Sequence, residues 1–278
     1  MNGRETPVHR RSALRSGAGA LLAGVLTTGC TDNRGTAPAS PAHDDPPPRA
    51  RKAPGAVRPA PGPHRFPGRP VQIEYGPRNR ARVALTFHGQ GDLHGQGDPA
   101  LARTALARTV LAEAERTGAR LTVLAVGSRL DDHPAMARRI LDGGHDLGNH
   151  TQNHLDISTM DETQAYAEIT GCAERLRRLT GSIGTWFRPS RTRYATPLVQ
   201  RLAGRAGYPH VLSYDVDSLD FTSPGVVAVT RKVAGELCNG SVISLHFGYP
   251  DTVAALPLLL TEISRRRLRA VTTTELLT

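Results

Sequence analysis

The stretch GHDLGNHTQNH, residues 144–154, sets the interpretation of the whole chain. Its beginning, residues 145–148, is typical of a short buried strand, and two histidines four residues apart follow it, His150 and His154. Histidines at this spacing lie on one face of a helical turn, so they can present two imidazoles to one cation, with a carboxylate completing the ligands. The pair alone is weak evidence, because histidine pairs also cap helices or lie at surfaces. The surrounding elements therefore have to show whether other ligands come close.

Strand-like apolar runs alternate with helix-like stretches on both sides of this motif. The strand-like runs are residues 83–87, 121–126, 145–148, 185–187, 211–216, 242–247 and 270–273. The helix-like stretches are residues 99–117, 134–141, 162–179, 197–206, 225–237 and 253–267. Such alternation predicts an α/β fold with parallel strands, either an open doubly wound sheet or an irregular (β/α) barrel with about seven strands.

Polar side chains collect directly after these strands, and the carboxyl ends of parallel strands meet at one edge. The residues concerned are His88, Asp92, His150, His154, Arg188, Asp217, Asp220 and His246. No G-x-S-x-G elbow and no G-x-G-x-x-G turn accompanies them. The set therefore favours a divalent-metal site, where a bound water would become acidic and a substrate carbonyl would be polarised.

Residues 80–275 resemble the polysaccharide deacetylases of the NodB-homology type, which form carbohydrate esterase family four. GHDLGNHTQNH is similar to the second motif of that family, H-[ST]-x-x-H. The family's other motifs, TFDDG, R-x-P-Y-G, D-x-x-D-W and L-x-x-H, fall in family order on residues 86–92 (TFHGQGD), 188–192 (RPSRT), 217–221 (DSLDF) and 243–246 (ISLH).

The resemblance implies a NodB-homology-like irregular barrel and a divalent metal, usually zinc, that removes an N-acetyl group from a glycan with water as the nucleophile. It implies that His150 and His154 bind the metal. By the same resemblance His246 is the general acid that protonates the leaving amine, Asp220 orients it, and Arg188 positions the catalytic base.

The first motif departs from the family pattern. Its two aspartates supply the base and a metal ligand, but this chain has His88 and Gly89 at those positions. The pentapeptide HGQGD occurs twice, at residues 88–92 and 94–98, so Asp92 or Asp98 can supply the carboxylate ligand. We expect Asp92, because its copy adjoins the strand. We expect His88 to be either a base with a pKa near neutrality or a third nitrogen ligand of the metal.

Two further departures concern the substrate-binding rim. Arg191 stands where the third motif has tyrosine, and the family implies that the backbone N–H near it helps to hold the oxyanion. Phe221 stands where the fourth motif has tryptophan. We therefore expect Arg191 and Phe221 to contact the substrate and to shape a rim unlike that of the family.

Residues 1–30 are typical of an export signal. A twin arginine, Arg10 and Arg11, precedes a mildly apolar segment, residues 18–26, that is too short to span a bilayer. The segment ends at Cys30 in a sequence that resembles a lipobox, although Thr27 occupies the position where leucine is usual. We expect export, with either a lipid anchor at Cys30 or ordinary cleavage and secretion.

Residues 31–70 contain eleven of the chain's 21 prolines and almost no large apolar side chains, which predicts a disordered linker. One catalytic domain then occupies residues 71–278. Its two cysteines, Cys172 and Cys238, are expected to be buried free thiols, with a disulfide as the alternative.

The net charge of +10 is concentrated before the domain. Residues 1–70 hold eleven Lys and Arg against four Asp and Glu, whereas the rest holds 24 against 21. Without a basic stripe interleaved with aromatics, nucleic-acid binding is not expected. We expect a glycan partner, and contact with a membrane only through Cys30.

Our leading hypothesis is an exported, metal-dependent hydrolase that deacetylates amino-sugar glycans such as peptidoglycan or chitin-like polymers. One alternative is a hydrolase of the same fold acting on another non-peptide C–N bond, and a second is a catalytically impaired surface glycan-binding protein. The retained set of His246, Asp220 and Arg188 favours an enzyme, because a binding protein has no evident need for it.

Overall fold

The computed structural model describes residues 60–88 and 99–278. Its strands are β1 (Gln72–Ile73), β2 (Arg82–His88), β3 (Thr122–Ala125), β4 (Asp146–Asn149), β5 (Val211–Leu212), β6 (Val216–Asp217), β7 (Val242–His246) and β8 (Arg269–Ala270). Its α-helices are α1 (Pro99–Arg116), α2 (Gly127–Asp132), α3 (Ala135–Asp142), α4 (Glu162–Thr180), α5 (Pro197–Arg205), α6 (Val226–Glu236), α7 (Pro250–Arg265) and α8 (Thr273–Leu277). No helix within these ranges combines the length and apolar character needed to cross a membrane. The predicted signal peptide, Cys30, Asp92 and Asp98 lie outside the described residues.

Every strand pairing is parallel, which confirms the predicted α/β class. The ladder runs in the order β4-β3-β2-β7-β6, with β8 paired to β2, while β1 pairs with β5. The predicted strand at residues 211–216 is divided into β5 and β6. The one predicted at residues 185–187 is reduced to isolated bridges from Phe187 to Asn149 and Val211.

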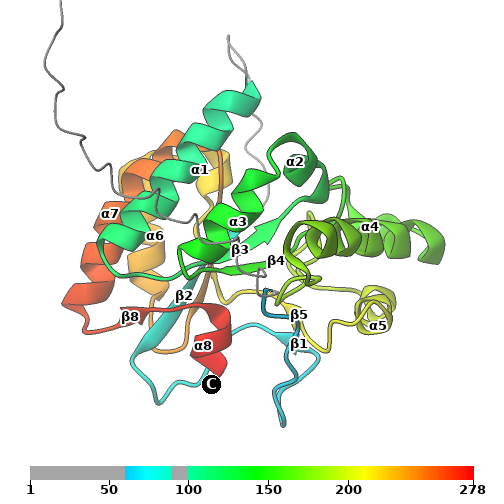
Figure 1. The fold of residues 1–278 in the computed structure, drawn as a ribbon. Coiled ribbons are helices and arrows are strands. Elements are labelled where there is room, and N and C mark those ends of the chain that lie inside the picture. The colour runs from blue at the N-terminus through cyan, green and yellow to red at the C-terminus, as the bar shows by residue number, and fades with distance from the viewer. Residues whose placement is uncertain (1–59, 89–98) are drawn as a thin grey trace, which may run out of the picture. The chain divides into compact units, whose positions relative to one another are not determined.

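Strand β2 lies at the centre of the fold (Figure 1), and every residue after Arg82 is buried. Val83, Leu85 and Phe87 join one apolar cluster with residues of α1 and α7, whereas Ala84 joins another with Trp186. Because strand side chains alternate between faces, His88 extends to the same face as Ala84. Both faces of the strand are covered, as is usual for a parallel sheet.

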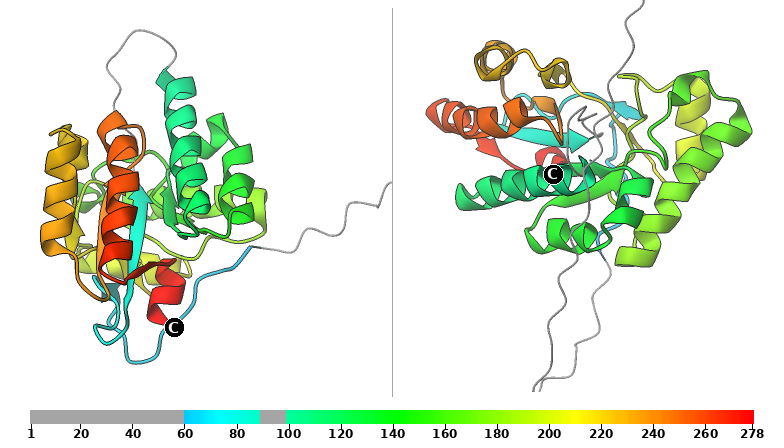
Figure 2. Two further views of the ribbon diagram at one scale, coloured as in Figure 1. Left: turned by 90° about the vertical axis from the view of Figure 1, so that its left-hand side faces the viewer. Right: turned by 90° about the horizontal axis from the view of Figure 1, so that it is seen from above.

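The helices cover two flanks of this sheet. Helices α6, α7 and α1 lie side by side along one flank (Figure 2), and α4 packs with α5 on another. Helix α4 begins with a capping box of Asp161 and Gln164 and ends at Gly181, whose φ of 80° is the left-handed conformation that glycine adopts without strain. The helix therefore has fixed ends, and its buried face supports the loop that follows β4.

The structure corrects several sequence predictions. The predicted strand at residues 270–273 ends at Ala270, and Thr273 already begins helix α8. Helix α2 was not predicted, because its six residues are too few to show helical periodicity. Cys172 is buried as expected, but Cys238 is exposed, and neither forms a disulfide.

Residues 60–70 belong to the folded part of the chain, so the prediction of a linker up to residue 70 is wrong there. Phe66 is only 6% exposed, and its ring stacks on that of Trp186 at 5.5 Å between centroids. The backbone N–H of Phe66 donates to Nε2 of His210 at 2.9 Å, and Ala60 N–H donates to Thr180 O at 3.0 Å. One buried phenylalanine in a proline-rich sequence is too weak a signal to predict this packing.

We expect Phe66→Ala to lower the free energy of unfolding by about 3 kcal/mol, the lower end of the cost of deleting a buried phenylalanine ring. The half-exposed Val71 supplies the control, because Val71→Ala removes little buried surface. Denaturant unfolding of both variants measures the difference. Equal stability of the two would show that residues 60–70 do not contribute to the fold.

Candidate functional site

The parallel strands bring four histidines together at their carboxyl edge. His88 and His246 are paired in register at the ends of β2 and β7, and their ring centroids are 4.2 Å apart. The ring of His150, which follows β4, lies 4.7 Å from that of His88. His154 continues the cluster, with its ring 5.0 Å from that of His150. The structure thus gathers four residues that the sequence had distributed over three strand ends.

A chain of hydrogen bonds joins two of these imidazoles and fixes the proton of His150. Nδ1 of His150 lies 3.0 Å from the backbone oxygen of Arg188, which can only accept, so this nitrogen carries the proton. When His150 is neutral, its Nε2 has a lone pair and accepts from Nδ1 of His88 at 3.1 Å. Nε2 of His88 then accepts from the hydroxyl of Ser244 at 2.8 Å.

Both of these imidazoles are held in the neutral form. Burial lowers the pKa of His88 well below its ordinary value, and the charges of His246 and Arg188 act in the same direction. Burial also lowers the pKa of His150 well below its ordinary value, with His154 and Arg188 adding to the effect. The expectation of a His88 pKa near neutrality is therefore wrong, because the sequence does not show how deeply the ring is buried.

His246 and Asp220 form a closely bonded pair. Nδ1 of His246 lies 2.7 Å from one carboxylate oxygen of Asp220, and the other oxygen accepts from the backbone N–H of His246 and from the hydroxyl of Thr252. Burial alone would raise the pKa of Asp220, but these hydrogen bonds lower it. An ionised Asp220 holds the proton of His246 on Nδ1 and leaves Nε2 on the opposite side of the ring.

Arg188 is a buried cation with neutral partners. It is 1% exposed, and its guanidinium donates to Leu212 O at 3.1 Å, to Thr86 Oγ1 at 2.9 Å and to Ser213 O at 2.8 Å. Among the residues that the structure describes, it has no carboxylate partner of the kind that a purely structural role would suggest. Burial lowers the pKa of Arg188, and Tyr214 and Asp217 act in the opposite direction. Uncompensated burial of a charge is costly, so the site favours anions nearby.

The loop that carries His150 and His154 is not helical, contrary to the expectation from their spacing. Thr151 and His154 both have positive φ, 68° and 59°, a conformation that is uncommon for such residues and that usually marks a functional site. The loop is held from α4, where the buried carboxylate of Glu168 accepts from the backbone N–H and the side-chain amide of Asn153.

Sequence reasoning missed the residues that support the histidines. Thr86 and Ser244 each lie two positions before a histidine on a strand, so they share the face of His88 and His246. This spacing of two was a usable signal. Glu168 lies on the helix that follows the histidine loop and Thr252 on the helix that follows His246, and nothing in the sequence relates them to the site.

The two predicted rim residues lie on neighbouring loops. Phe221 is 45% exposed, and its ring meets that of His246 edge to face at 5.2 Å. Arg191 is exposed, with a φ of 56°, three residues after Arg188. Asp217 accepts from the backbone N–H of Leu219 at 3.1 Å, and its charge opposes the lowering of the pKa of Arg188.

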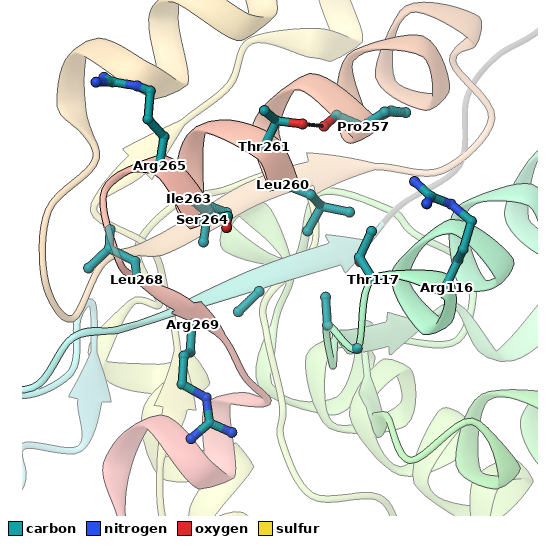
Figure 3. A pocket seen from close by; sticks show the side chains of 13 residues that line it. Arg116, Thr117, Pro257, Leu260, Thr261, Ile263, Ser264, Arg265, Leu268 and Arg269 are labelled. Carbon is teal, nitrogen blue, oxygen red and sulfur yellow. Dashed lines mark hydrogen bonds between the residues drawn. The ribbon is translucent and has the colours of Figure 1, made fainter.

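A cavity of about 630 Å³ lies elsewhere, between the ends of α1 and α7 and strand β8 (Figure 3). Its lining includes Arg116, Leu260 and Arg269 but no histidine or acidic residue. Because β8 pairs with the first residues of β2, this cavity is at the opposite end of that strand from His88. It therefore offers no group for acid–base or metal chemistry.

The described side chains at this site supply some, but not all, of the ligands that a divalent metal needs. His150 has the orientation of a metal-binding histidine, with Nδ1 donating to a carbonyl. Its Nε2 lone pair faces Nδ1 of His88 at 3.1 Å, so a metal there would replace the His88 N–H as the partner of that lone pair. His154 lies beside it. Among residues 60–88 and 99–278, however, no three histidine, cysteine or acidic side chains are already arranged to hold a metal. Two imidazoles fit, and the predicted carboxylate, Asp92, lies outside the described residues.

Comparison with known proteins supports one family. The sequence profile of the polysaccharide deacetylases matches residues 76–211. A peptidoglycan-N-acetylglucosamine deacetylase of Bacillus cereus is 32% identical over 163 residues, which cover 57% of this chain and 76% of the relative. A second B. cereus enzyme of that name is 27% identical over 62% of this chain, and the match spans only 58% of its own length.

Solved structures share the fold. A peptidoglycan N-acetylglucosamine deacetylase in complex with a hydroxamate matches with a TM-score of 0.65 and 24% identity, over 74% of this chain and 92% of its own. A Bacillus anthracis pseudoenzyme of carbohydrate esterase family four matches with a TM-score of 0.66 and 18% identity, over 76% of this chain and 70% of its own. The fold thus occurs in similar proteins with and without activity.

Proposed function

The chain belongs to the polysaccharide deacetylase family, and we propose that it is a metal-dependent hydrolase that removes N-acetyl groups from amino-sugar glycans, either peptidoglycan or chitin-like polymers. The observation that carries the proposal is the pair of His246 and ionised Asp220, which His88 connects to the imidazoles of His150 and His154. It unites a proton donor and a metal-binding face at one edge of the sheet.

We assign the metal site to His150, His154 and a carboxylate of the loop at residues 89–98, with zinc as the metal. A divalent metal bound there would lower the pKa of a water molecule and polarise the acetamide carbonyl. The backbone oxygen of Arg188 keeps the lone pair of His150 Nε2 directed into the site. His150 thus contributes a ligand whose ring is already oriented, and its lone pair is free when His88 carries its proton on Nε2.

In the reaction, water oxygen bonds to the acetyl carbon, the C–N bond breaks, and the sugar nitrogen takes a proton to leave as an amine. His246 supplies that proton from Nε2, because Nδ1 is held by Asp220 at 2.7 Å. Asp220 also stabilises the protonated imidazole before transfer. Acetate and a free amino sugar result.

His88 occupies the place of the family's base, and its hydrogen bonds allow two roles. The hydroxyl of Ser244 can donate to Nε2 of His88 or accept from it, so Ser244 supports either neutral tautomer. With the proton on Nε2, the Nδ1 lone pair of His88 faces His150 and can bind a cation or take a proton. His88 therefore serves as a third nitrogen ligand or as the base.

The repeated pentapeptide HGQGD contains both candidates for the carboxylate ligand, Asp92 and Asp98. We predict that Asp92→Ala loses metal, whereas deletion of residues 93–98 keeps metal and activity, because one copy suffices to connect strand and helix. Metal content of the purified variants measures both. If Asp98→Ala loses metal and Asp92→Ala does not, the second copy supplies the ligand instead.

We also propose export through the twin-arginine route, with a lipid anchor at Cys30. Replacing Arg10 and Arg11 by lysine should leave the precursor in the cytoplasm, and Cys30→Ala should release the protein from membranes. Fractionation followed by immunoblotting measures both. A Cys30→Ala protein that stays with the membrane would contradict the anchor.

The main rival is a glycan-binding protein without activity, which the loss of the first-motif aspartates at His88 and Gly89 favours. Acetate release from N-acetylated chito-oligomers and from peptidoglycan separates the two, with glycan binding measured in parallel. Binding without acetate would support the rival. Release of amine from a non-sugar amide, and not from either glycan, would support a hydrolase of another C–N bond.

A further inference from the structure

The loop after Phe187 carries three arginines next to the histidine cluster: Arg188, Arg191 and Arg193. In the part of the chain that the structure describes, no guanidinium of this trio has a carboxylate within ion-pair distance. Asp217 is a nearby acid that acts on Arg188 through its charge alone. Arg191 and Arg193 therefore add positive charge near the buried Arg188, and among the described residues no carboxylate forms an ion pair with any of the three.

Arg193 is held in one orientation. Its guanidinium carbon lies 5.1 Å from the ring centroids of both Tyr194 and Tyr214, and Nη2 donates to the backbone oxygen of Tyr214 at 3.0 Å. Its Nε is buried and has no hydrogen-bond partner among residues 60–88 and 99–278. A guanidinium fixed between two aromatic rings loses little side-chain entropy on binding, because its plane is already set.

Tyr214 connects this arginine to the candidate active site. Its ring stacks on that of His88 with 6.4 Å between centroids, and Arg188 lies 5.3 Å from the same ring. Two guanidiniums and the His88 imidazole thus contact one tyrosine ring. Arg193 is therefore linked to the histidine cluster through one tyrosine ring.

The rest of the rim suits sugars. Exposed apolar side chains stand on the same loops: Leu155 next to His154, Tyr194 next to Arg193, and Phe221 next to Asp220. Such surfaces pack against the apolar faces of sugar rings, whereas planar arginines recognise carboxylates through paired hydrogen bonds. The combination matches a glycan that also bears an acid.

We propose that Arg193, with Arg191 beside it, forms a subsite for a carboxylate on the glycan, so that the preferred substrate is an acid-bearing amino-sugar polymer rather than a neutral one. The inference rests on the proposed function for the identity of the ligand as a glycan. It adds a specificity element outside the groups that carry out the reaction.

The test compares three ligands in the presence of a chelator, so that turnover does not alter them. They are a disaccharide of N-acetylglucosamine and N-acetylmuramic acid, the methyl ester of its carboxylate, and neutral N,N′-diacetylchitobiose. Binding by calorimetry should be about tenfold or more tighter for the acid than for the ester, which is the scale of one charge-assisted hydrogen bond. The preference should weaken with added salt.

Variants of Arg193 test whether this residue causes the tighter binding of the acid. Arg193→Gln should remove the difference between acid and ester while leaving the affinity for the ester unchanged, and Arg193→Lys should retain part of it. Arg205→Gln is the matched control, because Arg205 also lies over a tyrosine ring, that of Tyr166, but is paired with Glu162. It should change neither affinity.

Equal binding of acid and ester by the unaltered protein would overturn the inference, and this result does not depend on how any variant folds. A loss of equal size for both ligands in Arg193→Gln would also overturn it. Acetate release from the neutral chito-oligomer is measured separately. Its absence would count against the proposed deacetylase, whereas its presence without a charge preference would count against the subsite alone.

Discussion

His246→Ala is expected to lower the turnover of an N-acetylated glycan by roughly 10²–10⁴-fold, the usual contribution of a general acid. Bound metal should not change, because Nδ1 of His246 is engaged by Asp220 and the predicted metal ligands lie on other loops. Steady-state kinetics with metal analysis of the same sample measures both quantities. His133→Ala is the control, since that residue lies between α2 and α3 and takes no part in the ring contacts of the histidine cluster.

Two outcomes would contradict this assignment. Unchanged turnover in His246→Ala would remove it from the reaction. Loss of metal as complete as that in a ligand variant would make His246 a metal ligand instead of an acid.

His150→Ala should weaken metal binding more than about 100-fold, because losing only a hydrogen-bond partner of a metal-binding histidine already costs 10–100-fold. Activity should fall with it. His150→Gln keeps a polar side chain of similar length near Arg188 O and His88, so it separates loss of the ligand from disturbance of the hydrogen-bonded chain. Competition with a chromophoric chelator measures the affinity of both variants.

Retention of tight metal binding in both variants would place the metal elsewhere. Recovery of the affinity in His150→Gln alone would show that His150 supports the site through its hydrogen bonds without serving as a ligand.

The position of the candidate site followed from the sequence because parallel strands all end at one edge. His88, His150 and His246 each follow an apolar run, and a fold with parallel strands has to bring such residues together. The pair of His246 and Asp220 was expected from the family resemblance, and the structure places their side chains 2.7 Å apart. Strand and helix positions were predictable for the same reason, since buried runs and amphipathic stretches differ in period.

Features that depend on contacts between separate elements of the fold were not predictable from the sequence. The backbone turns that give Thr151 and His154 positive φ are supported by Glu168, on a helix that begins after the loop. The low pKa of His88 depends on how many elements bury it. Likewise the packing of Phe66 on Trp186 joins residues 120 positions apart, and composition alone made residues 60–70 look like linker.

The most direct test of the central claim, that this chain is an active deacetylase although His88 replaces the first-motif aspartate, is acetate release by a preparation of known metal content. The purified chain is stripped of metal, reconstituted with increasing zinc, and incubated with N-acetylated chito-oligomers and with peptidoglycan. Our account predicts that acetate and free amine appear in equal amounts on at least one glycan, in proportion to bound metal up to one ion per chain. Full metal occupancy with no acetate from either glycan would contradict it.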